Sequence, residues 1–428
     1  MTRLVIANAA VPAAILDDPA SGALRPVDIV IDGAAIAAIV PAGTAPPGDD
    51  RIDADGGLVL PAFADIHTHL DKGHIWPRRQ NPDGTWLGAL LEVLKDREAN
   101  WAADDVERRM DFALRCAFAN GTAAIRTHLD AAPPQHEISL AVFEAMRDRW
   151  AGRIELQAVA LVGPDTMLDP VAFDAVARRV KAARGMLGGS VRNEPNARAA
   201  VFAAVEKAGE LGIDIDLHID ETLAPDSMAL RHFADAVIET GYAGKALAGH
   251  CCVLSVQDEA VWQATIERVA QAGISVVSLP MCNLYLQDRA MPRTPRYRGV
   301  TLVNELRAAG VRVALASDNT RDPFYAYGDL DMIEVFREGA RITQFDHPQD
   351  HAWTWVRSVS ADACEIAGFT HRGTLAQGAP ADFVLFRARS WTELNARPQS
   401  DRRVFRAGVE IERVLPDYRE LDDLMGAA

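Results

Sequence analysis

Two histidines, His67 and His69, lie just beyond an apolar run that ends at Phe63. Alternate residues of a β-strand point to the same side, so both imidazoles could bind one cation at the end of such a strand. A pair with this spacing also arises by chance among ordinary polar residues. Its interpretation therefore depends on the other residues of the chain that could bind a metal ion.

His128, His218, His250 and Asp318 each close a further apolar run. Two of them complete a set of three imidazole nitrogens and one carboxylate oxygen, formed by His67, His69, His218 and Asp318. This donor set suits one divalent ion, Zn²⁺ or Fe²⁺. Such an ion lowers the pKa of a bound water to about 7 and so provides a nucleophile at neutral pH. We therefore predict a hydrolytic metal centre.

Two residues near this set could act on protons or on the nucleophile. Glu221 follows His218 by three residues, and its carboxyl group could protonate a substrate nitrogen while the nucleophile attacks the neighbouring carbon. An acid that caps a helix or faces solvent is the alternative for Glu221. His250 could be an additional ligand, could hydrogen-bond the nucleophile, or could be a buried structural histidine. Both residues are candidates for catalysis.

The residues that could do chemistry recur at the ends of apolar runs, which are separated by helical patterns. Successive ends are mostly about 30 residues apart, the length of one strand–helix–strand step. The ends fall near His69, His128, Gln157, Arg192, His218, His250, Cys282 and Asp318. Eight such ends predict an α/β fold, a (β/α)8 barrel of the TIM type, whose active site lies at the carboxyl ends of its strands.

The interval between His69 and His128 is nearly twice as long as the others. Its Pro, Gly and Asn content predicts a long loop over the barrel mouth, where the loop could serve as a lid. Within residues 71–100, Lys72, His74 and Trp76 could reach a substrate or could face water.

Both chain ends contain short strand-like runs separated by Gly, Pro and Asp. We predict that residues 1–61 and 373–428 together form a small β-sandwich domain. The barrel is then expected in residues 62–372.

Composition restricts the class of protein. The chain has 428 residues, 49% of them hydrophobic, and its 44 basic and 60 acidic residues give a net charge of −16. These values favour a large globular protein over a nucleic-acid-binding protein, which would need a basic face. Five cysteines without C-x-x-C spacing, no run as long as a membrane span and no clear signal peptide indicate a cytoplasmic location without membrane association. Assembly into a homo-oligomer stays open.

Two other hydrolase designs lack their residues in this chain. A two-metal centre on such a barrel generally needs a bridging lysine at the end of the fourth strand, and residues 188–193 contain none. A second architecture of nucleobase deaminases needs an H-x-E motif and a downstream P-C-x-x-C motif, and neither is present. A single metal ion is therefore favoured.

The chain resembles the amidohydrolase superfamily over nearly its whole length, and within it the cytosine deaminase-like group of mononuclear metal deaminases. The pair formed by His67 and His69 is generic to the superfamily. More specific are Gln157, the segment from Asp216 to Glu221 and the segment from Asp318 to Pro323.

The resemblance implies a role for each of these residues. Asp318 would hold the metal ion together with the three histidines and would pass on a proton of the attacking water. Glu221 would protonate the ring nitrogen, His250 would orient the nucleophile, and Gln157 would hydrogen-bond the amide edge of a base.

Departures from the group's pattern alter the expected substrate pocket. Asn319 replaces a second aspartate, Phe324 replaces a tryptophan, and Arg321 stands where an apolar residue is expected. Arg192 ends the fourth strand in place of an aromatic-rich segment. Either arginine could pair with an acidic substituent of the substrate or could form an ordinary ion pair on a loop.

The expected reaction is the hydrolytic deamination of an amino-substituted nitrogen heterocycle, with release of ammonia. Cytosine or a close pyrimidine is the first prediction for the substrate. A larger or acidic base, such as pterin-6-carboxylate or a triazine, is the alternative, as is hydrolysis of a cyclic amide or an alkylamine. A non-catalytic binding protein is disfavoured because none of the expected ligands is missing.

Overall fold

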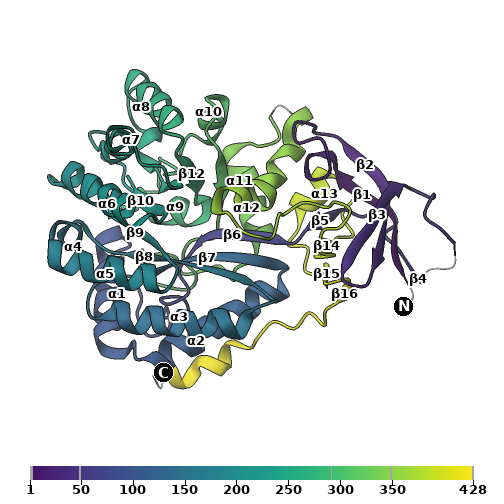
Figure 1. Cartoon of the computed structure of the whole chain (residues 1–428), viewed down its shortest axis with the longest axis horizontal. Helices are drawn as coiled ribbons and strands as arrows, with labels where there is room; N and C mark the ends of the chain where they lie inside the picture. The colour runs from purple at the N-terminus through teal and green to yellow at the C-terminus, as the bar shows by residue number, and fades with distance from the viewer. Residues whose placement is uncertain (1–2, 48–49, 291, 348, 427–428) are drawn as a thin grey trace.

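Eight parallel strands form the centre of the computed structural model (Figure 1). They are β6 (Phe63–Thr68), β7 (Thr122–Asp130), β8 (Glu155–Leu161), β9 (Met186–Val191), β10 (Ile215–Ile219), β11 (Ala246–His250), β12 (Ser275–Ser278) and β13 (Val313–Leu315). Each strand pairs in parallel with the next one along the chain. A parallel bridge between Thr68 and Asp318 connects the two ends of this sheet. The predicted (β/α)8 barrel is confirmed.

Strand β10 illustrates how the sequence places a functional side chain inside the barrel. Asp216 and His218 alternate with Ile215, Leu217 and Ile219, and all five residues are buried. Because successive side chains of a strand point to opposite faces, the polar residues face the barrel interior while the apolar residues face the surrounding helices. The same alternation places His67 of β6 on the interior side.

Helices cover the barrel and fill the connections between its strands. The longer ones are α1 (Trp86–Asn100), α2 (Ala103–Ala119), α3 (Gln135–Trp150), α5 (Pro170–Ala182), α6 (Ala197–Leu211), α7 (Ala229–Thr240), α8 (Glu259–Ala272) and α11 (Met332–Thr343). The shorter ones are α4 (Pro164–Leu168), α9 (Pro280–Leu286), α10 (Val303–Ala308), α12 (Ala361–Ala367) and α13 (Trp391–Ala396). Short 3-10 helices are η1 (Ala13–Ile15), η2 (Cys252–Ser255), η3 (Gln349–Val359) and η4 (Tyr418–Leu424).

Local sequence signals set the limits of individual helices. Asp169 caps α5, because its side chain accepts hydrogen bonds from the backbone amides of Val171 and Ala172. Pro170 occupies the first turn, where its missing amide proton is no loss. Gly212 ends α6 in the left-handed conformation, with φ of 62°, which a glycine adopts without strain.

Two four-stranded sheets beside the barrel combine segments from both chain termini (Figure 1). The first contains β1 (Leu4–Pro12), β2 (Leu24–Asp32), β3 (Ala35–Pro41) and β4 (Asp50–Asp53). The second contains β5 (Val59–Pro61), β14 (Phe383–Leu385), β15 (Arg403–Arg406) and β16 (Val409–Glu410). Because β5 pairs with β14, the two termini build one sheet, as expected. The structure describes residues 3–47, 50–290, 292–347 and 349–426, and the domain limits 1–61, 62–372 and 373–428 remain predictions.

The segment after β16 leaves the sheets and returns to the barrel (Figure 1). There η4 packs on α2, where Leu421 is buried against Phe112 and Cys116. Arg108 of α2 pairs with Asp423 at 2.7 Å. This part of the predicted second β-segment therefore contacts the barrel instead of extending a sheet. Within the described ranges, none of the helices combines the length and the apolar character needed to cross a membrane.

Candidate metal centre and active site

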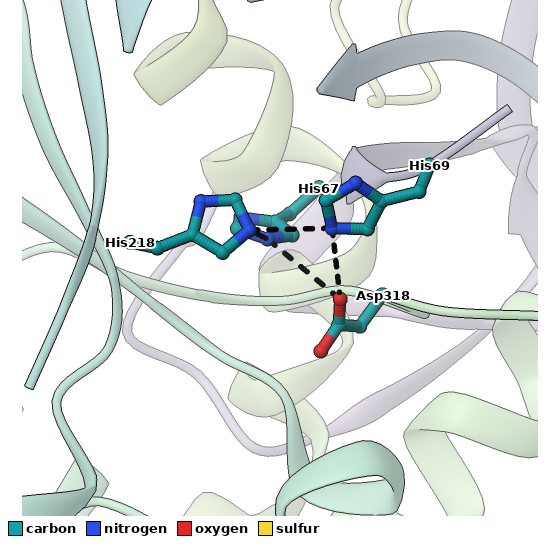
Figure 2. Close-up of side chains that lie close together, drawn as sticks. All are labelled: His67, His69, His218 and Asp318. Carbon is teal, nitrogen blue, oxygen red and sulfur yellow. Dashed lines mark hydrogen bonds and ion pairs between the residues drawn. The ribbon is translucent and has the colours of Figure 1, made fainter. Parts of the chain in front are cut away.

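Four side chains converge at the carboxyl end of the barrel (Figure 2). His67 lies in β6, His69 directly follows it, His218 lies in β10, and Asp318 follows β13. Nε2 of His218 lies 3.1 Å from Nε2 of His67 and 3.2 Å from Nε2 of His69. Oδ1 of Asp318 lies 3.2 Å from Nε2 of His69 and 3.9 Å from Nε2 of His67. The structure thus brings together all four predicted ligands.

The chemistry of this group fits a divalent cation. Burial lowers the pKa of His67 and His218 well below the usual value and that of His69 to about 4, so all three imidazoles are neutral. Ligands about 2.1 Å from a tetrahedral ion lie about 3.4 Å from one another, which is close to the spacing observed. Three neutral nitrogens and one carboxylate oxygen aimed at a common point are the ligand set expected for Zn²⁺ or Fe²⁺.

The backbone around Asp318 holds its carboxylate toward the histidines. Asp318 has φ of 64°, a left-handed conformation that is unfavourable for a residue other than glycine. Its amide donates to the carbonyl oxygen of His67 at 2.8 Å, and its own carbonyl oxygen accepts from Thr68 Oγ1 at 2.8 Å. Asn319 Nδ2 donates to Oδ1 at 2.8 Å, while Oδ2 has no hydrogen-bond partner among the described residues. The strained conformation is therefore fixed by β6.

A second group of possible ligands, His67, His128 and Asp216, lies deeper in the barrel. Asp216 is already paired with the buried Arg126 at 3.0 Å, so the negative charge of Asp216 is compensated without a metal ion. Since His67 belongs to both groups, one ion at the first group is the arrangement that the charges favour.

Glu221 is completely buried beside this centre. Trp86 Nε1 donates to its Oε2 at 2.7 Å, and its Oε1 lies 3.6 Å from Nδ1 of His250. Burial raises the pKa of Glu221, against the opposing influence of His250. A carboxyl group with a raised pKa holds its proton closer to neutral pH, as a general acid requires.

His250 ends β11 with φ of 71°, and the centroid of its ring lies 4.9 Å from that of His218 and 5.3 Å from that of His67. Asn283 Nδ2 lies 3.0 Å from its Nδ1, whereas its Nε2 is without a hydrogen-bond partner in the described part of the chain. Gly249 makes room for the ring of His67, because a Cβ atom at position 249 would lie 2.7 Å from Cε1 of His67. His250 therefore keeps Nε2 available for a ligand in the site.

A cavity of about 510 Å³ adjoins the four convergent residues. Seven of the predicted site residues line it, namely His69, His218, Glu221, His250, Arg192, Asn319 and Phe324. Helix α1 contributes Trp86, Leu90, Val93, Leu94 and Arg97. Segment 71–100 therefore borders the barrel mouth as expected, but its second half is a helix and not a loop.

Gln157 is the first of two predicted substrate-binding residues that the structure places elsewhere. It is the third residue of β8 and not the last, so it lies toward the amino end of the barrel. Its Oε1 accepts from Arg126 at 2.9 and 3.0 Å, and its Nε2 donates to the carbonyl oxygen of Ala367 at 3.2 Å. Contrary to the prediction, Gln157 does not line the cavity. Strand β8 continues to Leu161, and Leu161 lines the cavity instead.

Arg321 is the second predicted substrate-binding residue that lies outside the cavity. Its φ of 48° turns the side chain away from the cavity, and its guanidinium lies 4.1 Å from the centroid of the Tyr418 ring in η4. Arg321 therefore joins the C-terminal segment to the barrel. Arg192, in contrast, stays at the cavity wall, where its guanidinium lies on the ring of Trp86.

Two further residues line the cavity: Lys72, for which the sequence left contact with a substrate or with water open, and Trp86, which no sequence pattern singled out. Lys72 is buried, and its Nζ lies 4.7 Å from the centroid of the Phe324 ring. The charge of Lys72 acts on the buried carboxyl groups of Asp71 and Asp322, whose pKa values it lowers against the larger, opposing effect of burial. Trp86 could not be assigned, because only tertiary structure brings it to Glu221.

Comparison with known proteins decides the family. A model described as "Amidohydrolase family" matches residues 50–107 and 112–409. The chain belongs to the amidohydrolase family. It is thus a metal-dependent hydrolase of carbon–nitrogen bonds other than peptide bonds, as predicted.

Relatives of this amidohydrolase include a pterin deaminase of Rhizobium rhizogenes, 54% identical over 99% of this chain and 97% of the relative. An N-isopropylammelide isopropyl amidohydrolase of a Pseudomonas species is 24% identical over 80% of this chain and 82% of its own length. The structure of a 5-methylcytosine deaminase from Klebsiella pneumoniae, liganded with 5-fluorocytosine, superimposes with a TM-score of 0.81. It covers 96% of this chain and 97% of its own at 24% identity, so this similarity concerns the fold.

Proposed function

We propose that this amidohydrolase deaminates a pterin hydrolytically and releases ammonia. The observation that carries the proposal is the 54% identity with a pterin deaminase over nearly the full length of both chains. The prediction of cytosine or a close pyrimidine as the substrate gives way to its alternative, because the similarity to a 5-methylcytosine deaminase is much weaker in sequence. In a pterin the amino group is on a carbon between two ring nitrogens, and an oxo group is on the same ring.

The cavity offers contacts that suit such a bicyclic ring. Trp86 and Phe324 line it with their centroids 5.9 Å apart and can contact the flat faces or edges of an aromatic ligand. Lys72 supplies an ammonium group for the oxo oxygen of the ring. Arg192 borders the same cavity and can pair with an acidic substituent, as in pterin-6-carboxylate.

His67, His69, His218 and Asp318 would hold one divalent ion, Zn²⁺ or Fe²⁺. When bound, such an ion would lower the pKa of a water molecule and so supply a nucleophile for the carbon that carries the amino group. Burial opposes ionisation of Asp318, but its hydrogen bond to His69 and the nearby His250 and His67 hold its pKa well below its usual range. Asp318 is therefore an anion, and its free Oδ2 can accept the proton that the attacking water loses.

Glu221 and Asp318 carry out the proton transfers to the substrate. Glu221 protonates the ring nitrogen beside the attacked carbon, so that the carbon becomes tetrahedral without negative charge accumulating on the ring. His250 Nε2 is free to hydrogen-bond the oxygen that attacks. Asp318 then returns its proton to the amino nitrogen, which leaves as ammonia, while the hydroxyl oxygen becomes a carbonyl and gives its remaining proton back to the carboxylate of Glu221. Water and substrate thereby give ammonia and the oxo product.

The role of Lys72 predicts a defect in substrate binding. Lys72→Met keeps the aliphatic stem but removes the ammonium group, so we expect KM for a pterin to rise roughly 10- to 100-fold, as for a lost hydrogen bond to a charged group. Lys95→Met on α1 is the control, because Lys95 is exposed and paired with Glu92. Steady-state kinetics on both variants checks the prediction. Equal KM values for the two variants would exclude contact between Lys72 and the substrate.

A substrate panel tests the proposed function directly. Ammonia release is measured with pterin, pterin-6-carboxylate, cytosine, 5-methylcytosine, isoguanine and creatinine, using enzyme loaded with Zn²⁺ or Fe²⁺. We expect kcat/KM to be highest for one of the two pterins, because the ring can contact Trp86, Phe324 and Lys72, and the carboxylate of pterin-6-carboxylate can also pair with Arg192. A higher kcat/KM for cytosine than for either pterin would reject the proposal and restore the pyrimidine.

A further inference from the structure

Trp86 connects helix α1 to the proposed general acid. Its Nε1 donates to Oε2 of Glu221 at 2.7 Å, although the two residues are 135 positions apart. On the face of its indole ring lies the guanidinium of Arg192, with Cζ 3.4 Å from the ring centroid. Residues from three separate segments therefore meet at this indole.

The turn before α1 fixes the position of Trp86. Thr85 caps the helix, because its Oγ1 accepts from the amide of Gly88 at 2.9 Å. Asp83 Oδ1 in turn accepts from the amide and the hydroxyl group of Thr85, both at 2.8 Å. Gly88 leaves room for this side chain of Asp83, because a Cβ atom at position 88 would lie 2.1 Å from Asp83 Oδ1. Trp86 thus starts the helix in one defined orientation.

We propose that Trp86 is a positioning residue that determines which oxygen of Glu221 carries the transferable proton, an inference that rests on the proposed role of Glu221. An indole Nε1 is a donor only, so the oxygen that it contacts must act as an acceptor. A neutral carboxyl group has one O–H, and Oε2 is already the acceptor for Trp86. The proton is therefore on Oε1, which has no hydrogen-bond partner among the described residues and faces His250.

This assignment defines the proton transfer. The O–H bond at Oε1 of Glu221 breaks, and an N–H bond forms at the substrate ring nitrogen. The electron pair of the broken bond stays on the carboxylate. Its negative charge is then stabilised by the N–H of Trp86 at Oε2 and by the nearby charge of Arg192. Trp86 holds the carboxyl group in one rotamer before and after the transfer.

The test uses the two tryptophans at the two ends of α1, Trp86 as its first residue and Trp101 directly after its last. Trp86→Phe removes the N–H but keeps an aromatic ring beside Arg192 and Phe324. Trp101→Phe is the matched control, because Trp101 Nε1 donates to Asp96 Oδ2 at 2.8 Å at the other end of α1. We expect kcat for a pterin to fall roughly 10- to 100-fold in W86F, with KM little changed, and to stay near the wild-type value in W101F. Metal content and far-ultraviolet circular dichroism should be unchanged in both.

A double-mutant cycle with Glu221→Gln shows whether Trp86 acts through Glu221. We expect W86F to cause no further loss of kcat in the E221Q background, since the transferable proton is already absent. An equal loss in both backgrounds, or a W86F enzyme with wild-type kcat, would overturn the inference while leaving the deaminase function intact. If E221Q alone retained wild-type kcat, the general acid itself would be wrong, and the role of Trp86 would be excluded with it.

Discussion

Glu221→Gln is expected to lower kcat for a pterin by roughly 10² to 10⁴-fold, the usual contribution of general acid catalysis. The amide is isosteric with the carboxyl group and can still accept the N–H of Trp86. It cannot give up a proton to the ring nitrogen, so the tetrahedral adduct forms on an unprotonated ring. Because Glu221 is outside the predicted ligand set, the metal content should stay near one ion per chain.

The measurement is kcat at saturating pterin together with elemental analysis of the same samples. Glu92→Gln on α1 serves as the control, since Glu92 pairs with Lys95 at the surface of the helix. It should leave kcat unchanged. An E221Q enzyme that keeps its metal ion and turns over as fast as E92Q would remove Glu221 from the mechanism.

Asp318→Asn is expected to reduce both metal binding and activity. Changing a residue that only orients a metal ligand typically lowers metal affinity or activity 10- to 100-fold. Replacing the carboxylate that itself binds the ion should therefore lower metal affinity by more than about 10²-fold. The amide cannot provide the negative charge that balances a divalent ion among three neutral imidazoles. Treatment of the wild-type chain with a chelator should have the same effect, and Zn²⁺ or Fe²⁺ should restore the activity.

His128→Asn is the matched control for the metal site, because His128 belongs only to the second, deeper group of possible ligands. Metal content measured by elemental analysis should stay near one ion per chain in H128N and fall in D318N. Loss of the ion from H128N with retention in D318N would place the metal at the deeper group, beside Asp216.

The barrel and its ligands could be predicted because both depend on periodicity. A strand places alternate residues on one face, so His67 and the residues flanking His218 reveal their orientation in the sequence itself. Parallel strands of a barrel bring their carboxyl ends to one rim. Residues far apart in the chain, such as Asp318, could therefore be assigned to the same site.

The position of Gln157 could not be predicted, because the length of its strand could not. The apolar run predicts a strand end at Gln157, but the hydrogen-bonded ladder of β8 continues to Leu161. Apolar character alone does not fix the length of a strand, because the helix that follows is also apolar on one side. The displacement of four residues moves Gln157 from the cavity to a contact with Arg126.

Contacts made by loops were the other part that could not be predicted. Arg321 lies next to a predicted site segment, yet its left-handed backbone conformation directs it to Tyr418 of the C-terminal segment. Trp86 and Lys72 carry no periodic signal, since their positions depend on how segment 71–100 packs over the barrel. The tertiary structure is therefore needed to place the aromatic ring of Trp86 and the ammonium group of Lys72 in the substrate pocket.

The most direct test of the central claim is the identity of the products that a pterin gives in water enriched in heavy oxygen. Mass spectrometry and an ammonia assay should show one equivalent of ammonia and one heavy oxygen at the carbon that carried the amino group, and only with the metal-loaded enzyme. A product without the heavy oxygen, or turnover of the ring without ammonia, would contradict hydrolytic deamination by this site.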